Sequence, residues 1–212
     1  MTISITNTGA APGGPQTLLK SSGPINEGRV AELITQLLYE FGEDPRREGL
    51  RDTPCRVAAM WQNFLCQDAP EATCFPESTV NGQLVIVSGM SVWSFCEHHM
   101  LPMNLLVSAG YLADDRVVGL SKFGRIAQHF AGRLQVQERF TQQLAMHLAS
   151  VVGHDNVAVA VRGVHQCMSM RGVRMEPART TTVCRLGQFA ADAALASEFL
   201  TLTTAGQQGG VQ

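Results

Sequence analysis

The sequence is short of charged residues. Asp, Glu, Lys and Arg make up 16% of the 212 residues, and the formal net charge is −2. Only two of the sixteen basic residues are lysines, Lys20 and Lys122. A protein that wraps nucleic acid needs a clustered excess of basic side chains, so we expect no nucleic-acid partner. Any anion would have to be bound locally, by a few basic side chains.

Long apolar segments and an export signal are also lacking. No apolar run approaches about 18 residues, which argues against a membrane-spanning helix. The first residues, MTISITNTGAAPGGPQ, show no basic leader followed by an apolar core. We therefore expect a cytoplasmic protein with no membrane partner. In that reducing compartment its six cysteines are expected to be thiols or metal ligands, not disulfides.

Composition divides the chain into a central domain and two tails. Residues 1–24 are rich in Gly, Pro, Ser and Thr, and residues 204–212 are similar, so both are predicted to be flexible. Residues 25–203 are predicted to form one domain. Apolar spacing predicts helices after Asn26 and near Thr53, then strands, a helical pair, more strands and a final helix. This order is typical of the α+β class.

Three local predictions concern the ends of these elements. Asp114 and Asp115 are expected to form a hairpin turn between two strands. Ser121 is expected to cap the helix over SKFGRIAQHFAG. His165 and Cys167 are expected to lie on one strand, where residues i and i+2 face the same side.

The stretch SFCEHHMLP places a thiol, a carboxylate and two imidazoles in four consecutive positions. Cys96 and His99 are close enough in sequence to bind one ion from a turn, and His165 and Cys167 offer a second pair. A catalytic zinc can be bound by two thiolates and one imidazole, with its fourth coordination position open. A structural zinc site closed by two cysteines and two histidines is the alternative. In both cases sulfur and imidazole favour zinc over magnesium or calcium.

Three polar residues allow more than one interpretation. His98 adjoins a candidate ligand, and its imidazole, with an unperturbed pKa of about 6.5, is suited to transfer protons beside a metal ion. An exposed histidine without a chemical role is the alternative. Gln137 and Glu138 begin a predicted helix, where a buried carboxylate could accept hydrogen bonds from a guanine edge. Compensation of the helix dipole is the simpler interpretation of that glutamate.

Basic residues mark a candidate anion site at a strand-to-helix junction. Ser121, Lys122 and Arg125 lie in the first turns of a predicted helix, whose free N–H groups and dipole attract phosphate. Arg56 and Arg171 are further candidates. Each of these residues, taken alone, is more typical of a solvated surface.

Together, the segments EGLRDTPCRVAAMW, CEHH, VVGLSKFGRIAQHFAGRLQVQERFTQQLA and HQCMSMRGV closely resemble GTP cyclohydrolase I, in order and spacing, from about residue 26 to about residue 200. The resemblance implies a T-fold (tunnelling fold), with antiparallel strands and helices packed on one side. Subunits of that fold assemble into a barrel, typically a homodecamer of two pentamers. It also implies zinc-dependent hydrolysis of GTP to 7,8-dihydroneopterin triphosphate and formate, the first step of pterin and folate biosynthesis.

The resemblance further implies roles for individual residues. Cys96, His99 and Cys167 match the family's zinc ligands, and His98 and His165 match its proton-transferring histidines. The substrate contacts match a larger set, namely Arg56, Ser121, Lys122, Arg125, Gln137, Glu138 and Arg171. Residues from different subunits would build one pocket, so isolated subunits should be inactive.

The chain departs from the family pattern at a few positions: Met103, Leu105, Leu106, Ala113 and Ala178. None of them is a predicted ligand or proton carrier. The departures leave room for altered oligomer packing or weaker activity, and for a pathway-specific paralogue that supplies deazapurine biosynthesis. Two further alternatives stay open: a catalytically silent purine- or pterin-binding protein, and a related nitrile reductase that uses a nucleophilic cysteine without zinc.

Overall fold

The structure, a computed structural model, describes residues 25–65 and 73–205. The chain divides into two compact units with the boundary between Gln62 and Asn63, and each is described by itself. The predicted N-terminal arm and residues 206–212 of the predicted tail lie outside the described residues. Among the helices that the structure describes, none is both long and apolar enough to span a lipid bilayer.

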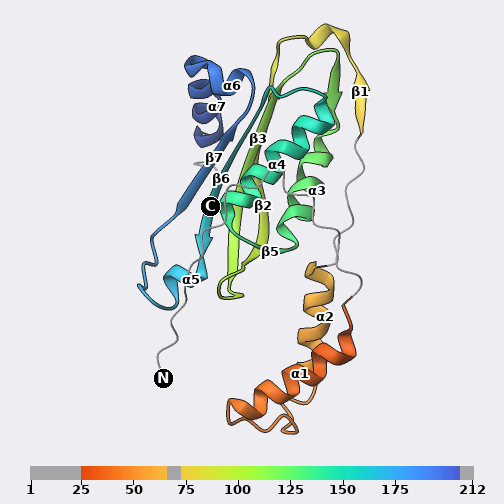
Figure 1. Cartoon of the computed structure of the whole chain (residues 1–212), viewed down its shortest axis with the longest axis vertical. Helices are drawn as coiled ribbons and strands as arrows, with labels where there is room; N and C mark the ends of the chain where they lie inside the picture. Colours follow the sequence, from red (N-terminus) through yellow and green to blue (C-terminus); the bar gives the residue numbers. More distant parts are fainter. Residues whose placement is uncertain (1–24, 66–72, 206–212) are drawn as a thin grey trace, which may run out of the picture. The chain divides into compact units, whose positions relative to one another are not determined.

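The N-terminal unit is built from two helices, α1 (Glu27–Glu40) and most of α2 (Thr53–Leu65) (Figure 1). The cap predicted for α1 is confirmed, because the Asn26 side chain accepts a hydrogen bond from the Arg29 backbone at 2.9 Å. Pro54 lies in the first turn of α2, where its missing N–H leaves no helical hydrogen bond unmade. The Ile25 backbone N–H donates to Gln62 Oε1 at 3.1 Å and so joins the start of α1 to α2.

A five-stranded sheet in the order β5-β2-β3-β6-β7 forms the centre of the C-terminal unit (Figure 1). The four longer strands pair antiparallel: β2 (Leu84–Cys96), β3 (Pro102–Leu112), β6 (Val157–His165) and β7 (Thr180–Arg185). The fifth strand, β5 (Leu134–Gln135), is too short to show a pattern in the sequence and pairs in parallel with the end of β2. The sheet is therefore mixed, within the α+β class that the sequence predicts.

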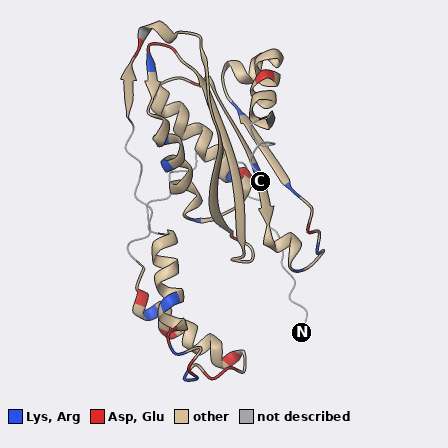
Figure 2. Ribbon diagram, turned by 180° about the vertical axis from the view of Figure 1, so that it is seen from behind, with Lys and Arg blue, Asp and Glu red and all other residues tan. Residues whose placement is uncertain are grey.

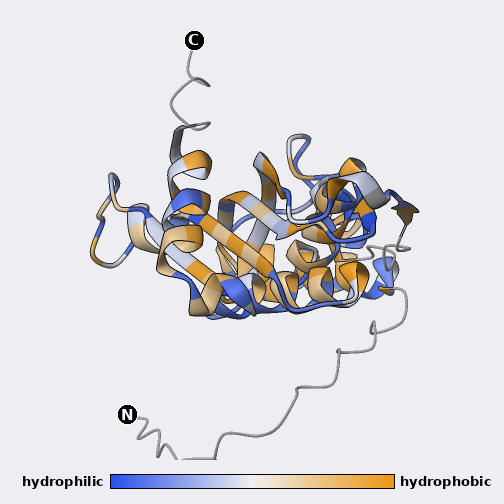
Figure 3. Cartoon of the chain, turned by 90° about the horizontal axis from the view of Figure 1, so that it is seen from above, coloured by the Kyte–Doolittle hydropathy of each residue, from blue (hydrophilic) through white to orange (hydrophobic). Residues whose placement is uncertain are grey.

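Two long helices, α3 (Leu120–Ala131) and α4 (Gln137–Val152), cover one face of this sheet (Figure 1). Alternation along β3 directs Met103, Leu105 and Val107 into the core beneath them, where each is at most 1% exposed. Figure 3 shows apolar residues along the strands and on these helices. Met103 and Leu105, like the buried Ala113, are thus core residues, so these departures from the family concern packing.

The opposite face is covered at one end by α6 (Gln188–Ala191) and α7 (Ala193–Ala205). Phe189 and Phe199 pack there against Ala158 of β6. The prediction is helices on one side of the sheet; α3 and α4 lie on one face, and α6 and α7 additionally cover one end of the other face. Strands β2 and β3 carry no charged residue, and Figure 2 shows both in tan along their length.

The predicted hairpin at Asp114 and Asp115 is wrong. The strand that follows, β4 (Arg116–Val118), pairs with β1 (Cys74–Pro76) in a separate two-stranded sheet, and not with β3. Asp114 Oδ1 accepts hydrogen bonds from the backbone N–H groups of Asp115 and Arg116. This local turn redirects the chain without returning it along β3. The residues between β1 and β2 include a 3₁₀ turn at Ser78–Val80.

Candidate active site

A closed turn follows β2 and carries the first metal-binding pair; we call residues 96–99 the metal turn. The Cys96 N–H donates to the Leu101 carbonyl at 2.9 Å, and the Met100 N–H donates back to the Cys96 carbonyl at 2.8 Å. Met100 has a φ of 52°, a left-handed conformation that reverses the chain sharply. The turn places Cys96 Sγ 3.8 Å from His99 Nδ1 and 3.7 Å from His98 Nδ1.

The third donor reaches the same place from another element than predicted. His165 ends β6, whereas Cys167 lies in the four-residue helix α5 (Gln166–Ser169), so the two do not share a strand. The single turn of α5 is closed by Ser169 Oγ, which donates to the His165 carbonyl at 3.1 Å. Pairing of β3 with β6 sets Met103 opposite His165, next to the end of β2.

The three donors fit a zinc ion. One ligand atom each from Cys96, His99 and Cys167 lies within 4.8 Å of the other two. Burial raises the pKa of the Cys167 thiol, and the neighbouring sulfur of Cys96 raises it further. Two sulfurs this close repel each other as thiolates, and a soft divalent cation removes the repulsion. Cys96 is buried, Cys167 is half-buried and His99 is exposed. Two sulfurs and an imidazole that are partly open to solvent match a zinc centre with room for another ligand.

Gln137 holds His165 beside this cluster through a buried amide whose N–H groups are engaged with the protein. Gln137 is 1% exposed, and its Nε2 donates to the carbonyls of Val161 and Thr180 and to Thr182 Oγ1 at 3.0, 3.2 and 3.1 Å. These donations fix the amide, so Oε1 must accept the 2.7 Å hydrogen bond from His165 Nε2. Burial lowers the pKa of His165, which favours the neutral ring. A neutral ring protonated at Nε2 has Nδ1 as its proton acceptor.

Two predicted substrate residues lie near these groups. Glu138, in the first turn of α4, is exposed, and its charge raises the pKa of His165 against the effect of burial. Arg171 follows α5 and donates from Nη1 to His99 Nε2. The structure therefore brings a carboxylate and a guanidinium to the cluster within one chain.

The remaining predicted substrate residues lie on α3 and on α2. Gly119, not Ser121, is the N-cap of α3, and no side chain caps this helix. Lys122 is half-buried and Arg125 exposed in its first two turns. Arg56 lies on α2, exposed, with Nη2 3.2 Å from an oxygen of Asp52.

The first and last turns of α3 are anchored at opposite ends of the sheet. Near the first turn, the Val118 N–H donates to the hydroxyl of Tyr111, at the far end of β3 from Met103. At the last turn, the Ala131 carbonyl accepts from Ser94, two residues before Cys96. The 12 residues of α3 span about 18 Å at 1.5 Å per residue. Ser121 and Lys122 therefore lie near the end of α3 that is remote from the metal turn of the same chain, and Arg125 lies about midway along the helix.

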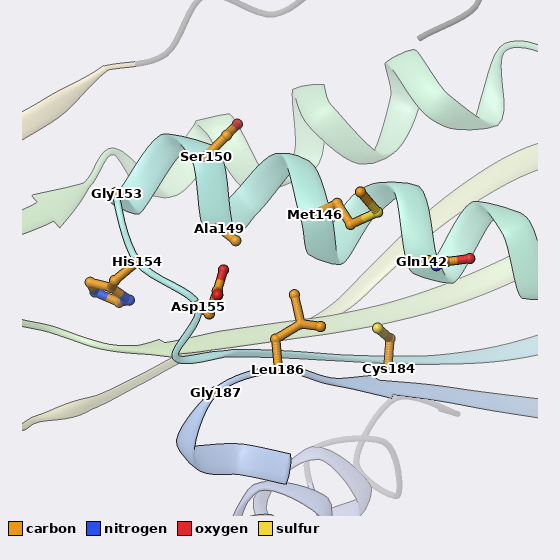
Figure 4. A pocket seen from close by; sticks show the side chains of 10 residues that line it. All are labelled: Gln142, Met146, Ala149, Ser150, Gly153, His154, Asp155, Cys184, Leu186 and Gly187. Atoms are coloured by element: carbon orange, nitrogen blue, oxygen red, sulfur yellow. The ribbon is translucent and has the colours of Figure 1, made fainter. Parts of the chain in front are cut away.

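A groove of about 730 Å³ between α4 and β7 is not part of this cluster. Figure 4 shows Gln142 and Met146 from α4 facing Cys184 and Leu186 across it, with His154 at the end away from Gln142. Burial raises the pKa of the Cys184 thiol, which keeps that thiol neutral. No predicted site residue lines the groove, so we place the chemistry at the metal turn.

One end of the sheet gathers two thiols and an imidazole, with further histidines beside them, and this set defines a metal-dependent enzyme with acid–base groups. The GTP cyclohydrolase I family matches residues 30–204. The chain belongs to this family and is an enzyme with GTP cyclohydrolase I activity. The zinc predicted from the sequence is consistent with both the family and the cluster.

Curated relatives cover most of the chain. GTP cyclohydrolase 1 of Mycobacterium leprae is 44% identical over 184 residues, which are 84% of this chain and 89% of that protein. The enzyme of Hyperthermus butylicus is 41% identical over 177 residues, covering 82% and 90%. The enzyme of Saccharomyces cerevisiae is 41% identical over 181 residues, covering 82% and 73%. Among solved structures, the archaeosine synthase QueF-Like in its apo form is 17% identical with a TM-score of 0.39, covering 48% of this chain and 90% of that one.

Proposed function

We propose that this chain converts GTP to 7,8-dihydroneopterin triphosphate and formate with Cys96, His99 and Cys167 as zinc ligands. The observation that carries the assignment is the convergence of these three side chains from β2, the metal turn and α5. A zinc ion held there would act as a Lewis acid and lower the pKa of water at the site. We propose that the enzyme works in the cytoplasm and that its product enters pterin and folate biosynthesis.

His98 and His165 move protons in this proposal. Opening the imidazole ring of guanine at C8 leaves negative charge on a ring nitrogen unless that nitrogen is protonated. The His98 imidazole, beside Cys96, is placed to donate this proton. His165, kept neutral by burial and bound through Nε2 to Gln137, is placed to accept a proton at Nδ1.

Glu138 and the basic residues bind the substrate in this proposal. The Glu138 carboxylate would accept two N–H hydrogen bonds from the guanine edge, a geometry that a carboxylate satisfies well. Gln137 would act on the substrate through His165, because the hydrogen-bonding groups of its amide are engaged with the protein. Arg171, near His99, would neutralise charge on the triphosphate.

We propose that one pocket takes residues from more than one subunit. Ser121 and Lys122 lie near the far end of α3 from the metal turn, and Arg125 lies midway along the helix, so we propose that all three serve the metal turn of a neighbouring chain. Arg56 would be a further triphosphate contact. The edges of the main sheet support an assembly of this kind. Among the described residues β7 pairs only with β6, and β5 covers only Phe95 and Cys96 of β2. Edge-to-edge pairing of subunits would close a barrel, with a decamer of two pentamers as the expected form.

The test measures formate release and pterin absorbance from GTP, with zinc quantified on the same purified sample. We expect turnover with about one zinc per chain. His98→Ala should keep its zinc and lose turnover by about two to four orders of magnitude. Cys167→Ala should lose zinc and turnover together, whereas Cys184→Ala, in the groove of Figure 4, should keep both.

Three outcomes would contradict the proposal. Zinc binding with GTP bound but unopened would identify a silent binding protein. Turnover without zinc would remove Cys96, His99 and Cys167 from their assigned role. Loss of zinc in His98→Ala would mean that the roles of His98 and His99 are exchanged.

A further inference from the structure

Glu97, inside the metal turn, is held by an arginine from α4. Its Oε2 accepts a hydrogen bond from Nη2 of Arg139, and the two side chains are only 34% and 29% exposed. The same Nη2 donates to the Leu134 carbonyl at 3.1 Å, and Nε of Arg139 donates to Gln135 Oε1 at 3.0 Å. The guanidinium therefore joins the metal turn to β5 and to the start of α4 at once.

The partners of Arg139 are themselves fixed. Gln135 is 2% exposed, and its Nε2 donates to the Phe130 carbonyl at 2.9 Å and to Gln143 Oε1 at 3.0 Å. Its Oε1 is consequently the atom that faces Arg139. The Glu97 N–H also donates to the Gln135 carbonyl at 3.0 Å. The metal turn is thus tied to Gln135 through its backbone and, by way of Arg139, through its side chain.

This link joins two halves of the site. Glu97 directly follows the ligand Cys96 and precedes His98, and Arg139 directly follows Glu138. A shift of the metal turn relative to α4 would separate the proton-transferring group from the base-binding group. Misplacement by about 1 Å can cost about 100-fold in rate.

We propose that Arg139 and Glu97 are a positioning pair. The pair holds the metal turn in a fixed position relative to the first turn of α4, so that His98 and Glu138 act on the same substrate molecule. The inference rests on the proposed function and deepens it, since neither residue is assigned contact with GTP or zinc. The pair works by geometry. Three donors of one planar guanidinium reach three different acceptors, and a lysine cannot reproduce that fork.

The experiment compares Arg139→Gln, Arg139→Lys, Glu97→Gln and the double variant Glu97→Gln/Arg139→Gln with the parent enzyme. For each, kcat and KM for GTP, the rate of zinc loss to a chelator and the unfolding temperature are measured. We expect each single variant to lose about 10- to 100-fold in kcat with a much smaller change in KM. Zinc affinity should fall by up to about 10-fold, as for other groups that orient metal ligands. The double variant should be no worse than the worse single one, because both changes break the same link.

Controls separate the possible failures. Arg46→Gln removes an exposed ion pair with Asp44 in the N-terminal unit and should leave kcat unchanged. A parent enzyme without turnover would refute the proposed function and not the pair. An active parent whose Arg139 variants keep kcat and zinc affinity, and lose only unfolding temperature, would show a merely structural role and overturn the inference. Additive losses in the double variant, or full activity in Arg139→Lys, would also overturn it.

Discussion

Gly163 on β6 lies against the Gln137–His165 pair and has no room for a side chain. A Cβ added there would lie 2.0 Å from Gln137 Oε1, 2.8 Å from His165 Nε2 and 3.0 Å from a methyl of Leu105. Since Cβ contacts under 3.0 Å are essentially never found, the Gln137 amide would have to retreat by at least about 1 Å. Gly163→Ala should therefore displace a buried side chain that is fixed on all sides.

The magnitude follows from the hydrogen bonds at stake. The Gln137 amide makes four, to His165, Val161, Thr180 and Thr182. A hydrogen bond contributes about 1 kcal/mol net, and a buried group left without its partner costs about 1 to 3 kcal/mol. We expect Gly163→Ala to lower the free energy of unfolding by about 2 to 4 kcal/mol. Because His165 loses the acceptor that orients it, kcat should fall by about 100-fold.

Chemical denaturation followed by circular dichroism, together with steady-state kinetics, would measure both effects. Gly124→Ala is the matched control, because Gly124 is helical and a Cβ there meets nothing within 4 Å. It should stabilise the protein by about 0.5 to 1 kcal/mol, since alanine is the better helix former. Adding Gln137→Ala to Gly163→Ala should recover part of the stability without the activity. Parent-like stability and kcat in Gly163→Ala would refute the close packing of this pair.

Two further predictions concern buried polar groups. Ser94 and Ser108 are both fully buried, but Ser94 Oγ donates to the Ala131 carbonyl at 2.9 Å, whereas Ser108 Oγ has no partner among the described residues. Urea titration should show a loss of about 1 kcal/mol for Ser94→Ala and no loss, or a small gain, for Ser108→Ala; equal effects would contradict the hydrogen-bond assignment. Burial, and to a smaller extent the nearby His129, lower the pKa of His147. The neutral form of His147 therefore stabilises the fold above the unfolded pKa of about 6.5. This stabilisation is lost as the pH falls below that value and through the lower pKa of the folded state. The unfolding temperature of the parent should drop more than that of His147→Leu between pH 7.5 and pH 5.5, and parallel pH profiles would exclude this role.

Features that depend on residues close together in the sequence could be predicted from the sequence. Cys96 and His99 are three residues apart in one turn, so their shared site followed from spacing. The helix α4 was predictable because apolar residues recur at helical spacing over its sixteen residues. The position of Cys167 could not be predicted in this way. Where β6 stops depends on the turn that Ser169 closes on His165, and an i, i+2 pattern is equally compatible with a longer strand.

Long-range contacts explain what sequence reasoning missed. The partner of Glu97, Arg139, is 42 residues away, and no periodicity connects them. The acceptors of the Gln137 amide lie 24 to 45 residues further along the chain. The resemblance to the family identified Gln137 as a residue of the site. The sequence could not reveal that the Gln137 amide is engaged with the protein. Nor could it show that α3 carries Lys122 away from the metal turn, because that direction is set by packing on the sheet.

If subunits assemble through their sheet edges as proposed above, the unpaired edge at β7 has a consequence for the chain before the subunits join. Its sequence, TTTVCR, consists mostly of β-branched residues, and its outer backbone groups have no strand partner among the described residues. Such an edge can pair with an extended segment of another chain, and Arg179 before the strand and Arg185 at its end offer charge as a weak safeguard. Newly made subunits would thus face a competition between joining one another correctly and forming aggregates. Substitutions that slow assembly would then appear in cells as lower yield of protein, not as a pool of inactive single subunits.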